Sequence, residues 1–598
     1  MATQRTGIAD IPVELLIDNI LPFCEAKDVF SLGCTNKFFA LVTTDDMFWK
    51  RRLAVDYNFT GSETARTSGW KFIYQRLRKP RVFVWGEKDK GRLGLQPFPK
   101  TTLSDVPFPV ELHLPGVRVV SLAASGMAFH ALDADGSVHI WGTLNGTSVA
   151  LRRDGFSEPH KTASTPMKLR LPAPTRSISC GRLHALTLDA NSTVWNFRSW
   201  GRPFRLASPS LDCSSPETTP VQIECGWAFS TVLTRSGDVY AWWPFGGDFE
   251  AKYREAMAEL DKDEYTKAIV PDDETVIPCH AWEIHKDPVK LPVLPDLPDL
   301  PATGLSEEEC KKETKLIKIA AFDNCLVGLT NKGHVLKIDG LTDEESIQIW
   351  RYLPNYSEMD KVKEHSAFRA ITGDDGQERS PQVEFSSDTL HITHVSAHFN
   401  SFFAYSSSMV LKGEIETTPE ALPTIIPELQ NRSVISVVLG DYHFGALTSS
   451  GKLLTWGQYS KGALGLGDPG KLPVGSPGGF ADEERRVRAQ NLGHGLPPNV
   501  TVPSEVRFDH GLKAEGRVER YCFAAASSGW HTGALVIDLA GDDVPPEHLK
   551  QYFEAEVPRE TAFNRGRWMG RGRGGWIHRP LPGIHMPPPA GAMPGNGA

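Results

Sequence analysis

Alternating hydrophobic and polar positions dominate the chain between residues 81 and 540. Short apolar runs flank turns such as Ala134-Asp135-Gly136 and Arg235-Ser236-Gly237, where glycine can adopt the positive φ that tight turns require. Each pair of runs therefore predicts a β-hairpin. Seven such units follow one another, starting near residues 126, 181, 226, 322, 398, 441 and 529.

An apolar strand that ends in small residues precedes several of these hairpins. Examples are VVSLAAS before Gly126, SISC before Gly181 and VQIEC before Gly226. Such strands are typical of buried, closely packed positions. Four short strands per unit are typical of propeller blades, because radial packing removes long exposed sheet edges. The pattern predicts a mainly β protein with a seven-bladed β-propeller at residues 81–540.

The two ends of this region complement each other. The last unit, GWHTGALVIDL (529–539), has no hairpin partner after it, and the first segment, RVFVWGEKDKGRLGL (81–95), has no leading strand. We therefore expect one blade to be closed by strands from both ends of the domain.

The stretch FVWGEKDKGRLGL (83–95) also has the glycine spacing of a phosphate-binding P-loop. A P-loop needs Lys followed by Ser or Thr after its second glycine, but Arg92 and Leu93 occupy those positions. The stretch returns as LTWGQYSKGALGL (454–466), with its Trp, Gly and Leu positions kept and its polar positions changed. This recurrence favours an architectural repeat over a nucleotide site.

The middle units depart from the repeat. Trp195-Asn196 and Lys337-Ile338 stand where Trp-Gly is expected, and insertions are predicted near 244–316 and 341–390. Within the first insertion, residues 249–267 read as a charged amphipathic helix. The proline-rich LPVLPDLPDLP (291–301) reads as an extended surface connector.

Helical periodicity replaces the β pattern in the first 60 residues. Asp10 is placed near the start of a first helix, with Pro12 in its first turn, and Asp28 can cap a second helix. Asp45 and Asp46 can cap a third. The apolar residues at helical spacing are Leu15, Leu16, Ile20 and Leu21 in the first helix, Val29, Leu32 and Phe39 in the second, and Phe48, Trp49 and Leu53 in the third. Three short helices form a small core that often needs a partner, and a helical linker (61–80) leads to the propeller.

Two family resemblances fit this layout. Residues 81–540 resemble the regulator of chromosome condensation repeat family, a seven-bladed propeller, in the WG…GxLGL pair and the G-x-x-H-(T/A)-x-x-L turns. Residues 1–60 resemble an F-box domain. The F-box match is carried by Ile11-Pro12, Glu14-Leu15-Leu16, Ile20-Leu21, Asp28, Leu32, Cys34, Asn36, Phe38 and Phe48-Trp49. Ile11 and Phe38 depart from the common Leu and Trp but keep apolar bulk. The whole resembles the fungal SCF-associated F-box proteins with such repeats.

The resemblance implies a substrate-recognition subunit of an SCF (cullin-RING) ubiquitin ligase, with no catalysis of its own. The F-box would dock on the Skp-type adaptor and, through it, on the cullin and RING subunits, while the propeller holds a protein substrate. The expected adaptor-binding residues are Ile11, Pro12, Leu15, Leu16, Ile20, Leu21 and Trp49. The alternative, implied by the propeller family, is guanine-nucleotide exchange on a Ran-like small GTPase.

Composition narrows the setting. Charged residues make up 23% of the 598 residues, the net charge is −9, and no apolar run approaches the length of a membrane span. The negative charge argues against nucleic acid as the main partner of the whole chain. Nine cysteines without a CxxC pair favour reduced thiols, so we expect a cytoplasmic or nuclear protein without membrane contact.

Four histidines at corresponding turns, His130, His184, His443 and His531, raise the alternative of hydrolysis or metal catalysis. No HExxH, His/Cys metal spacing or GxSxG accompanies them. We expect their ring nitrogens to satisfy backbone groups within blades, and we expect no catalytic residue, metal or cofactor.

Beyond the propeller, residues 541–562 predict a short helix and residues 563–598 a disordered Arg/Gly/Pro-rich tail. Arginines among glycines, with Trp568 and Trp576, are typical of segments that contact RNA weakly, and a solubilising tail is the alternative. The pattern does not identify the substrate-binding residues. Trp227 and Trp530, at loop positions, are candidates, with packing in the blade core as the alternative.

Overall fold

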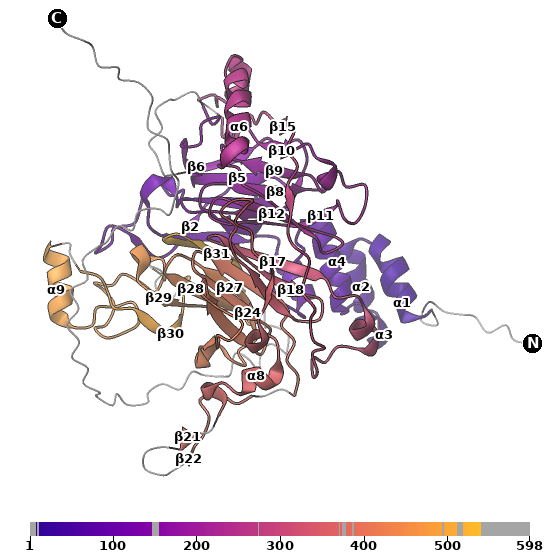
Figure 1. The fold of residues 1–598 in the computed structure, drawn as a ribbon. Coiled ribbons are helices and arrows are strands. Elements are labelled where there is room, and N and C mark those ends of the chain that lie inside the picture. Colours follow the sequence, from indigo (N-terminus) through magenta and orange to yellow (C-terminus); the bar gives the residue numbers. More distant parts are fainter. Residues whose placement is uncertain are drawn as a thin grey trace, which may run out of the picture. The chain divides into compact units, whose positions relative to one another are not determined.

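The computed structural model describes residues 8, 11–145, 155–272, 274–369, 371–372, 378–385, 388–492, 495–510 and 518–539. Seven sheets of four or five strands dominate it (Figure 1). The innermost strands of successive sheets contact one another around a closed ring, in the order β31, β3, β7, β11, β17, β23, β27 and back to β31. This arrangement confirms the predicted seven-bladed propeller.

Each blade is an antiparallel meander with its first strand innermost. Blade 2 comprises β3 (Val119–Ala124), β4 (Ala128–Asp133), β5 (Val138–Thr143) and β6 (Thr162–Leu169). Blade 3 comprises β7 (Thr175–Cys180), β8 (Ala185–Asp189), β9 (Val194–Phe197) and β10 (Phe204–Leu206). Blade 4 comprises β11 (Pro220–Cys225), β12 (Ser230–Thr234), β13 (Val239–Trp242) and β16 (Val289–Lys290). Blade 5 comprises β17 (Leu316–Phe322), β18 (Cys325–Thr330), β19 (Val335–Ile338) and β20 (Arg351–Tyr352). Blade 6 comprises β23 (His394–His398), β24 (Ser401–Tyr405), β25 (Val410–Glu414) and β26 (Thr424–Ile425). Blade 7 comprises β27 (Val434–Leu439), β28 (His443–Thr448), β29 (Leu453–Gly457) and β30 (Val500–Glu505).

Blade 1 closes the ring as expected from the complementary ends. Its inner strands, β31 (Arg520–Ser528) and β32 (His531–Asp538), come from the C-terminal side, and its outer strands, β1 (Arg81–Gly86) and β2 (Val106–Leu112), from the N-terminal side. β1 and β32 pair without interruption from Arg81↔Val536 to Gly86↔His531.

The first insertion does more than form a loop. Between β13 and β16 the chain forms α6 (Gly247–Leu260), then adds β14 (Val276–Ile277) in parallel to β6 and β15 (Trp282–Ile284) in parallel to β10. The residues from 243 to 288, which we call the strap, thus give blades 2 and 3 a fifth strand each before returning to blade 4. The predicted helix is confirmed, although it ends at Leu260 rather than 267.

Further insertions carry the remaining elements. The 341–390 region holds α8 (Met359–Lys363) and the hairpin β21 (Ile371–Thr372) and β22 (Glu378–Arg379). A third insertion, between β29 and β30, contains α9 (Glu483–Leu492) and was not anticipated. Other short helices are η4 (Asp89–Gly91), η5 (Pro209–Leu211), η6 (Glu264–Thr266), α7 (Glu307–Lys311), η7 (Pro354–Tyr356), η8 (Ser366–Phe368), η9 (Pro427–Leu429) and η10 (Ser460–Gly462).

The N-terminal helices differ from the expected three. Pro12 is the N-cap of α1 (Val13–Leu15), which continues as η2 (Leu16–Ile20) and η3 (Leu21–Phe23). The predicted second helix is two helices, α2 (Ala26–Gly33) and α3 (Lys37–Val42), because the Asn36 side chain accepts a hydrogen bond from the Phe39 amide and starts a new helix. Asp28 lies in the first turn of α2 rather than at its cap, which is Glu25.

The third predicted helix is confirmed as α4 (Asp46–Tyr57), and Asp45 caps it by accepting from the Phe48 amide at 2.6 Å. In the predicted linker, α5 (Trp70–Arg76) follows an irregular stretch. Asp10, the 541–562 helix and the 563–598 tail lie outside the described residues. No helix in the part that the structure describes is long and apolar enough to cross a membrane.

Candidate functional site

The seven residues expected to bind the adaptor divide into two groups. Leu16, Leu21 and Trp49 are 2%, 1% and 0% exposed, and they form part of the core of the N-terminal helices. The Trp49 indole also donates to the Thr43 carbonyl at 2.7 Å. Burial assigns these three a packing role, so in this conformation they reach no partner directly. The other four lie at the surface: Pro12 and Leu15 are exposed, and Ile11 and Ile20 are half-buried.

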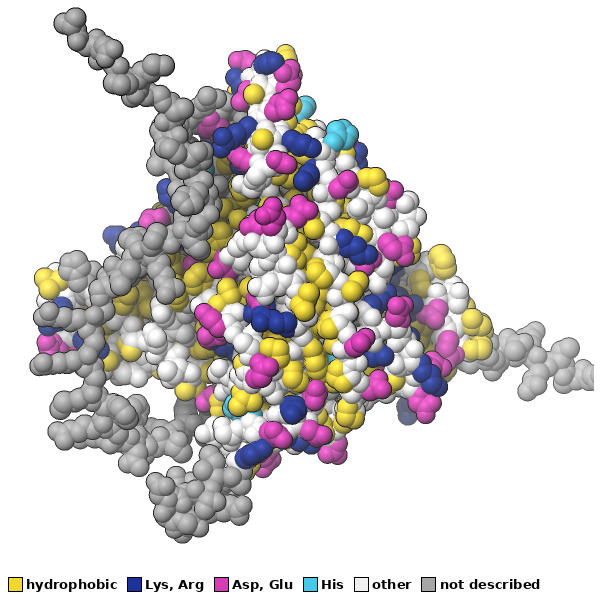
Figure 2. Space-filling view, in the orientation of Figure 1, with side chains coloured by type: hydrophobic (Ala, Val, Ile, Leu, Met, Phe, Trp, Pro, Cys, Tyr) yellow, Lys and Arg dark blue, Asp and Glu magenta, His cyan; other side chains and the backbone are white. Residues whose placement is uncertain are grey.

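Additional exposed apolar side chains lie on the same helices and were missed at the sequence level. Phe23 at the end of η3 is 88% exposed and Leu41 in α3 is 76% exposed, and Val13 also lies at the surface. Figure 2 shows hydrophobic side chains among charged ones on the outer margin of these helices. Single exposed apolar side chains are normal, whereas several gathered on one small module are typical of an interaction site.

The other side of the helical module is attached to the ring. Phe59 packs edge-on against Phe523, and Phe72 against Tyr521. The Asn58 side chain donates to the Thr175 carbonyl at 2.9 Å. These apolar residues are used internally, whereas those exposed on α1, η3 and α3, together with Met47 and Val55 on α4, remain available to a partner.

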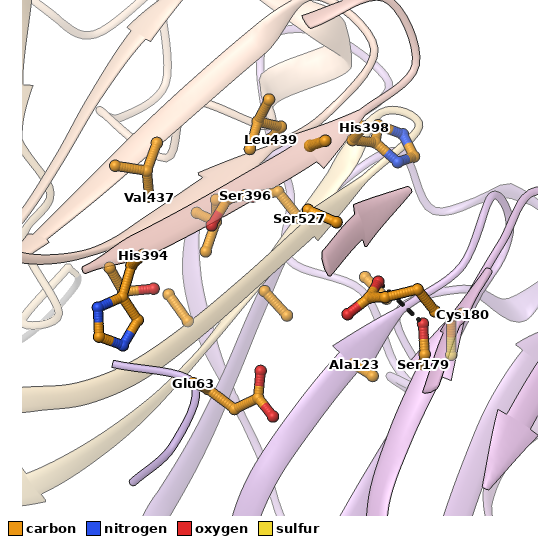
Figure 3. Close-up of a pocket in the computed structure, with 18 of the residues that line it drawn as sticks. Glu63, Ala123, Ser179, Cys180, His394, Ser396, His398, Val437, Leu439 and Ser527 are labelled. Atoms are coloured by element: carbon orange, nitrogen blue, oxygen red, sulfur yellow. Dashed lines mark hydrogen bonds between the residues drawn. The ribbon is translucent and has the colours of Figure 1, made fainter. Parts of the chain in front are cut away.

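The irregular stretch before α5 runs across one end of the central channel. The Lys318 ammonium donates to the Ser62 carbonyl and the Ala65 amide to the Ile435 carbonyl, both at 2.7 Å. Residues 62–64 thereby line a cavity of about 240 Å³ together with the innermost strands of all seven blades. Figure 3 shows Glu63 at this cavity together with Ser179, from blade 3, and His394, from blade 6.

A carboxylic acid dominates the electrostatics of this cavity. Burial, and then the Glu63 carboxylate, raise the pKa of Glu224 to about 8. Glu224 accepts hydrogen bonds from Gln222 at 2.9 Å and Ser179 at 3.4 Å. Burial lowers the pKa of His394 to about 3 and that of Lys318 below its ordinary value. At neutral pH the cavity therefore favours the uncharged forms of Glu224 and His394. Uncharged polar groups of this kind can form hydrogen bonds with enclosed water.

An ion pair lies at the opposite end of the channel. Arg182, in the turn after β7, bonds the Asp441 carboxylate, in the turn after β27, at 2.9 and 3.1 Å, and His398 lies 3.2 Å from the same carboxylate. Burial acts to raise the pKa of Asp441, but the His398 hydrogen bond and the Arg182 charge hold it well below its usual range. The pair joins blades 3 and 7 across the ring.

The four repeat histidines bridge neighbouring blades, which corrects the expectation of bonds within blades. His184 Nε2 lies 2.8 Å from the Ser230 hydroxyl and His443 Nε2 lies 2.9 Å from that of Thr532. The Trp200 indole donates to His130 at 3.0 Å, while His531 approaches the Ala128 carbonyl at 3.4 Å. Each imidazole thus fixes one blade to the next.

These histidines are poor acid–base groups. Burial lowers the pKa of His130 and His184 to about 3 and that of His443 to about 4. Within the described residues, no group of three or more His, Cys, Asp and Glu side chains is arranged to hold a metal ion.

Comparison with known proteins identifies the type of repeat in this chain. No protein-family model matches the chain. The RCC1-like G exchanging factor-like protein of Mus musculus is 24% identical over 454 residues, covering 67% of this chain and 83% of the relative. Protein RCC1 of Candida albicans is 22% identical over 407 residues, covering 66% of this chain and 70% of the relative.

SCF-associated factor 1 of Saccharomyces cerevisiae is 33% identical over 373 residues, which cover 60% of this chain and 42% of the relative. Among solved structures, human WBSCR16 matches with a TM-score of 0.45 at 17% identity, covering 77% of this chain and all of the other. Together with the seven sheets, the sequence relatives support one conclusion. The chain carries RCC1-like repeats on a seven-bladed propeller.

Proposed function

We propose that this chain is a non-catalytic substrate-recognition subunit of an SCF ubiquitin ligase. The N-terminal helices dock on a Skp-type adaptor, which brings the cullin and RING subunits, and the ring binds a protein target. Ubiquitin transfer belongs to the other subunits, and this chain contributes proximity.

The observation that carries the proposal is that Leu15, Phe23 and Leu41 are exposed on helices of a module that is attached to the ring elsewhere. Interface affinity is concentrated in a few large anchors of this kind. The name of the relative SCF-associated factor 1 supports the same assignment.

Guanine-nucleotide exchange on a Ran-like GTPase is the second candidate. It is favoured by the names of the relatives called RCC1-like G exchanging factor-like proteins, which cover more of this chain. An exchange factor would need the ring but not the exposed side of the N-terminal helices. The two functions can therefore be separated by variants of those helices.

The test is binding of the purified full chain to a recombinant Skp-type adaptor, measured by calorimetry. Leu15→Asp combined with Phe23→Asp should weaken binding by about 100-fold or more, because each large anchor contributes about 2 kcal/mol or more. Both side chains are exposed, so the far-UV circular dichroism and the Tm should change little.

Val293→Asp provides a matched control, because Val293 is an equally apolar side chain, 83% exposed, on the ring. This variant should bind the adaptor as the original chain does. Absence of adaptor binding by the original chain, combined with stable capture of a nucleotide-free Ran-like GTPase, would instead favour the exchange function.

A further inference from the structure

The two ends of the central channel are not equivalent. The helical module and its linker contact residues near the starts of inner strands, such as Lys318 in β17 and Thr175, the first residue of β7. The turns that follow the inner strands lie at the other end, about 20 Å away for strands of six residues. These turns, including Arg182 and Asp323, form what we call the free mouth.

A small pocket lies at the free mouth, between the turns of blades 3 to 6. Its lining includes Trp227, Asp323 and Phe399, and its volume is about 10 Å³. A space of that size accommodates one water-sized group. The Trp227 amide donates to the Asp323 carbonyl at 3.0 Å, which holds two of these turns together.

Asp323 is the carboxylate of this pocket, whose lining also includes Arg182 and His398. Within the described part of the chain, no salt bridge and no side-chain hydrogen bond engages its carboxylate, and burial raises its pKa. The nearby cation, Arg182, is already paired with Asp441. Both Arg182 and His398 contact the Asp441 carboxylate, so neither is paired with Asp323.

The rings of Trp227 and Phe399 line the pocket with this carboxylate, and Tyr442 lies next to Phe399. The Trp227 and Phe399 centroids are 6.2 Å apart, and those of Phe399 and Tyr442 are 5.5 Å apart. The Arg182 guanidinium already lies 5.0 Å from the Trp227 centroid, so one cation is accommodated on these rings. Tyr442 is exposed, and Phe399 is half-buried.

The backbone of these turns favours a role for the side chains. Phe399 has φ +54° and Asp323 has φ +26° at the first position of two-residue turns, where blade 1 uses Gly529. A bulky residue in the left-handed region costs about 1–2 kcal/mol. Such outliers concentrate at binding sites, where the side chain offsets the cost.

We propose that the pocket of Trp227, Asp323 and Phe399 binds the ammonium group of a lysine side chain presented by a segment of the target protein. This inference rests on the proposed function, because it takes the protein that presents the lysine to be the target of the ligase. A carboxylate supplies the opposite charge, and the aromatic faces attract the cation. A water-sized space suits an ammonium better than a planar guanidinium or a trimethylammonium.

The test uses the purified full chain and a library of acetylated, amidated octapeptides, so that lysine side chains supply the amines. Selection should enrich lysine at one position. In a selected peptide, lysine→norleucine should weaken binding by about tenfold, since it keeps the apolar stem and removes the charge. Replacement by arginine or trimethyl-lysine should also weaken it, but less. These changes leave the protein untouched.

The protein-side variant is Asp323→Asn, which keeps the shape and tolerates the left-handed backbone. It should weaken the lysine peptide about tenfold and remove the preference for lysine over norleucine. Asp296→Asn, an exposed carboxylate on the ring, is the control and should change neither. A library without lysine enrichment, or a lysine preference that survives Asp323→Asn, would overturn the proposal.

Failure here is distinguishable from failure of the proposed function. The peptide selection contains no adaptor, and the adaptor assay contains no target. Lysine selection without adaptor binding would leave the pocket assigned and remove the ligase role, whereas adaptor binding without lysine selection would remove the pocket alone.

Discussion

Two glycines of the repeated WG…GxLGL motif each face an indole of the next blade. A Cβ at Gly465 would lie 2.6 Å from Trp85 Nε1, and a Cβ at Gly94 would lie 2.9 Å from the Trp141 ring. Both glycines have positive φ, +70° and +64°. The motif is therefore a clasp between blades 7 and 1 and between blades 1 and 2. Its P-loop-like spacing follows from this packing rather than from phosphate binding.

Gly465→Ala should reduce stability strongly for this reason. Trp85 is fully buried and donates to the Ala463 carbonyl at 2.8 Å, so the indole cannot move away without losing that bond. Left-handed strain and overpacking together predict a loss of about 3 kcal/mol, measured by urea unfolding. Gly475→Ala is the matched control, because Gly475 has φ +79° and no atom within 4 Å of the added Cβ. It should cost about 1 kcal/mol; equal losses in the two variants would contradict the clasp.

At the scale of elements, the strap is held by a buried ion pair. Arg202 is 0% exposed; its Nη1 lies 2.7 Å from the Asp261 carboxylate and its Nε donates to the Thr266 carbonyl at 2.8 Å. The aromatic side chains of Phe249 and Tyr253 fix α6 against Phe204 of blade 3. The strap is thus part of the ring's core rather than a surface loop.

Arg202→Met should therefore loosen the strap. Removing one partner of a buried pair costs about 3–5 kcal/mol, and the partly exposed Asp261 places the expected loss near the lower value. Limited proteolysis should cut first between 247 and 290. Arg254→Met removes a pair with Glu250 from the same helix, but Arg254 is 74% exposed, so the change should be below about 1 kcal/mol. Similar cleavage of both variants would argue against the buried pair as the anchor.

Whether a strand pairs with a near or a distant part of the chain decides whether the sequence predicts it. Blade hairpins and their closure are recognisable because turn glycines and alternating residues are local signals. β14 and β15 were missed because each pairs in parallel with a strand about 80 to 110 residues earlier, which leaves no local pattern. At the candidate docking surface, periodicity identified Leu15 and Leu16 as apolar but did not distinguish Leu16, buried in the core, from Leu15, which is exposed, and it did not identify Phe23 or Leu41.

For the whole molecule, the linker joins the helical module to the ring through the channel. Ser62 and Ala65 are bonded to blades 5 and 7, and Glu63 lies at the cavity that all seven blades line. These contacts fix the module at one end of the channel, which leaves the free mouth at the other end for a target. The placement of the exposed Glu63 carboxylate beside Glu224 is the electrostatic cost of this arrangement.

The raised pKa of Glu224 predicts that the stability of the folded protein depends on pH. The pKa of Glu224 is about 8 in the folded protein and near its ordinary 4.5 in the unfolded chain, so the folded state binds one more proton between these values. The contribution of Glu224 to stability therefore falls as the pH rises from 4.5 to 8 and is constant above that. The charged or titratable groups around it are Glu63 from the linker, Cys180 from β7, Cys225 from β11, Lys318 from β17, and His394 and His398 from β23. Ser179 and Gln222 are its neutral hydrogen-bond donors.

Glu224→Gln should remove this dependence while keeping the side-chain shape. Its Tm should match that of the original chain near pH 4.5 and exceed it by an amount that grows to on the order of a few degrees at pH 8. Calorimetry at pH 5, 6.5 and 8 measures the difference. Glu63→Gln should lower the pKa of Glu224, because it removes the second cause of the shift, and so move the upper limit of the window below 8. A Tm difference between Glu224→Gln and the original chain that does not vary with pH would show that the linker and Glu224 are not electrostatically coupled to folding.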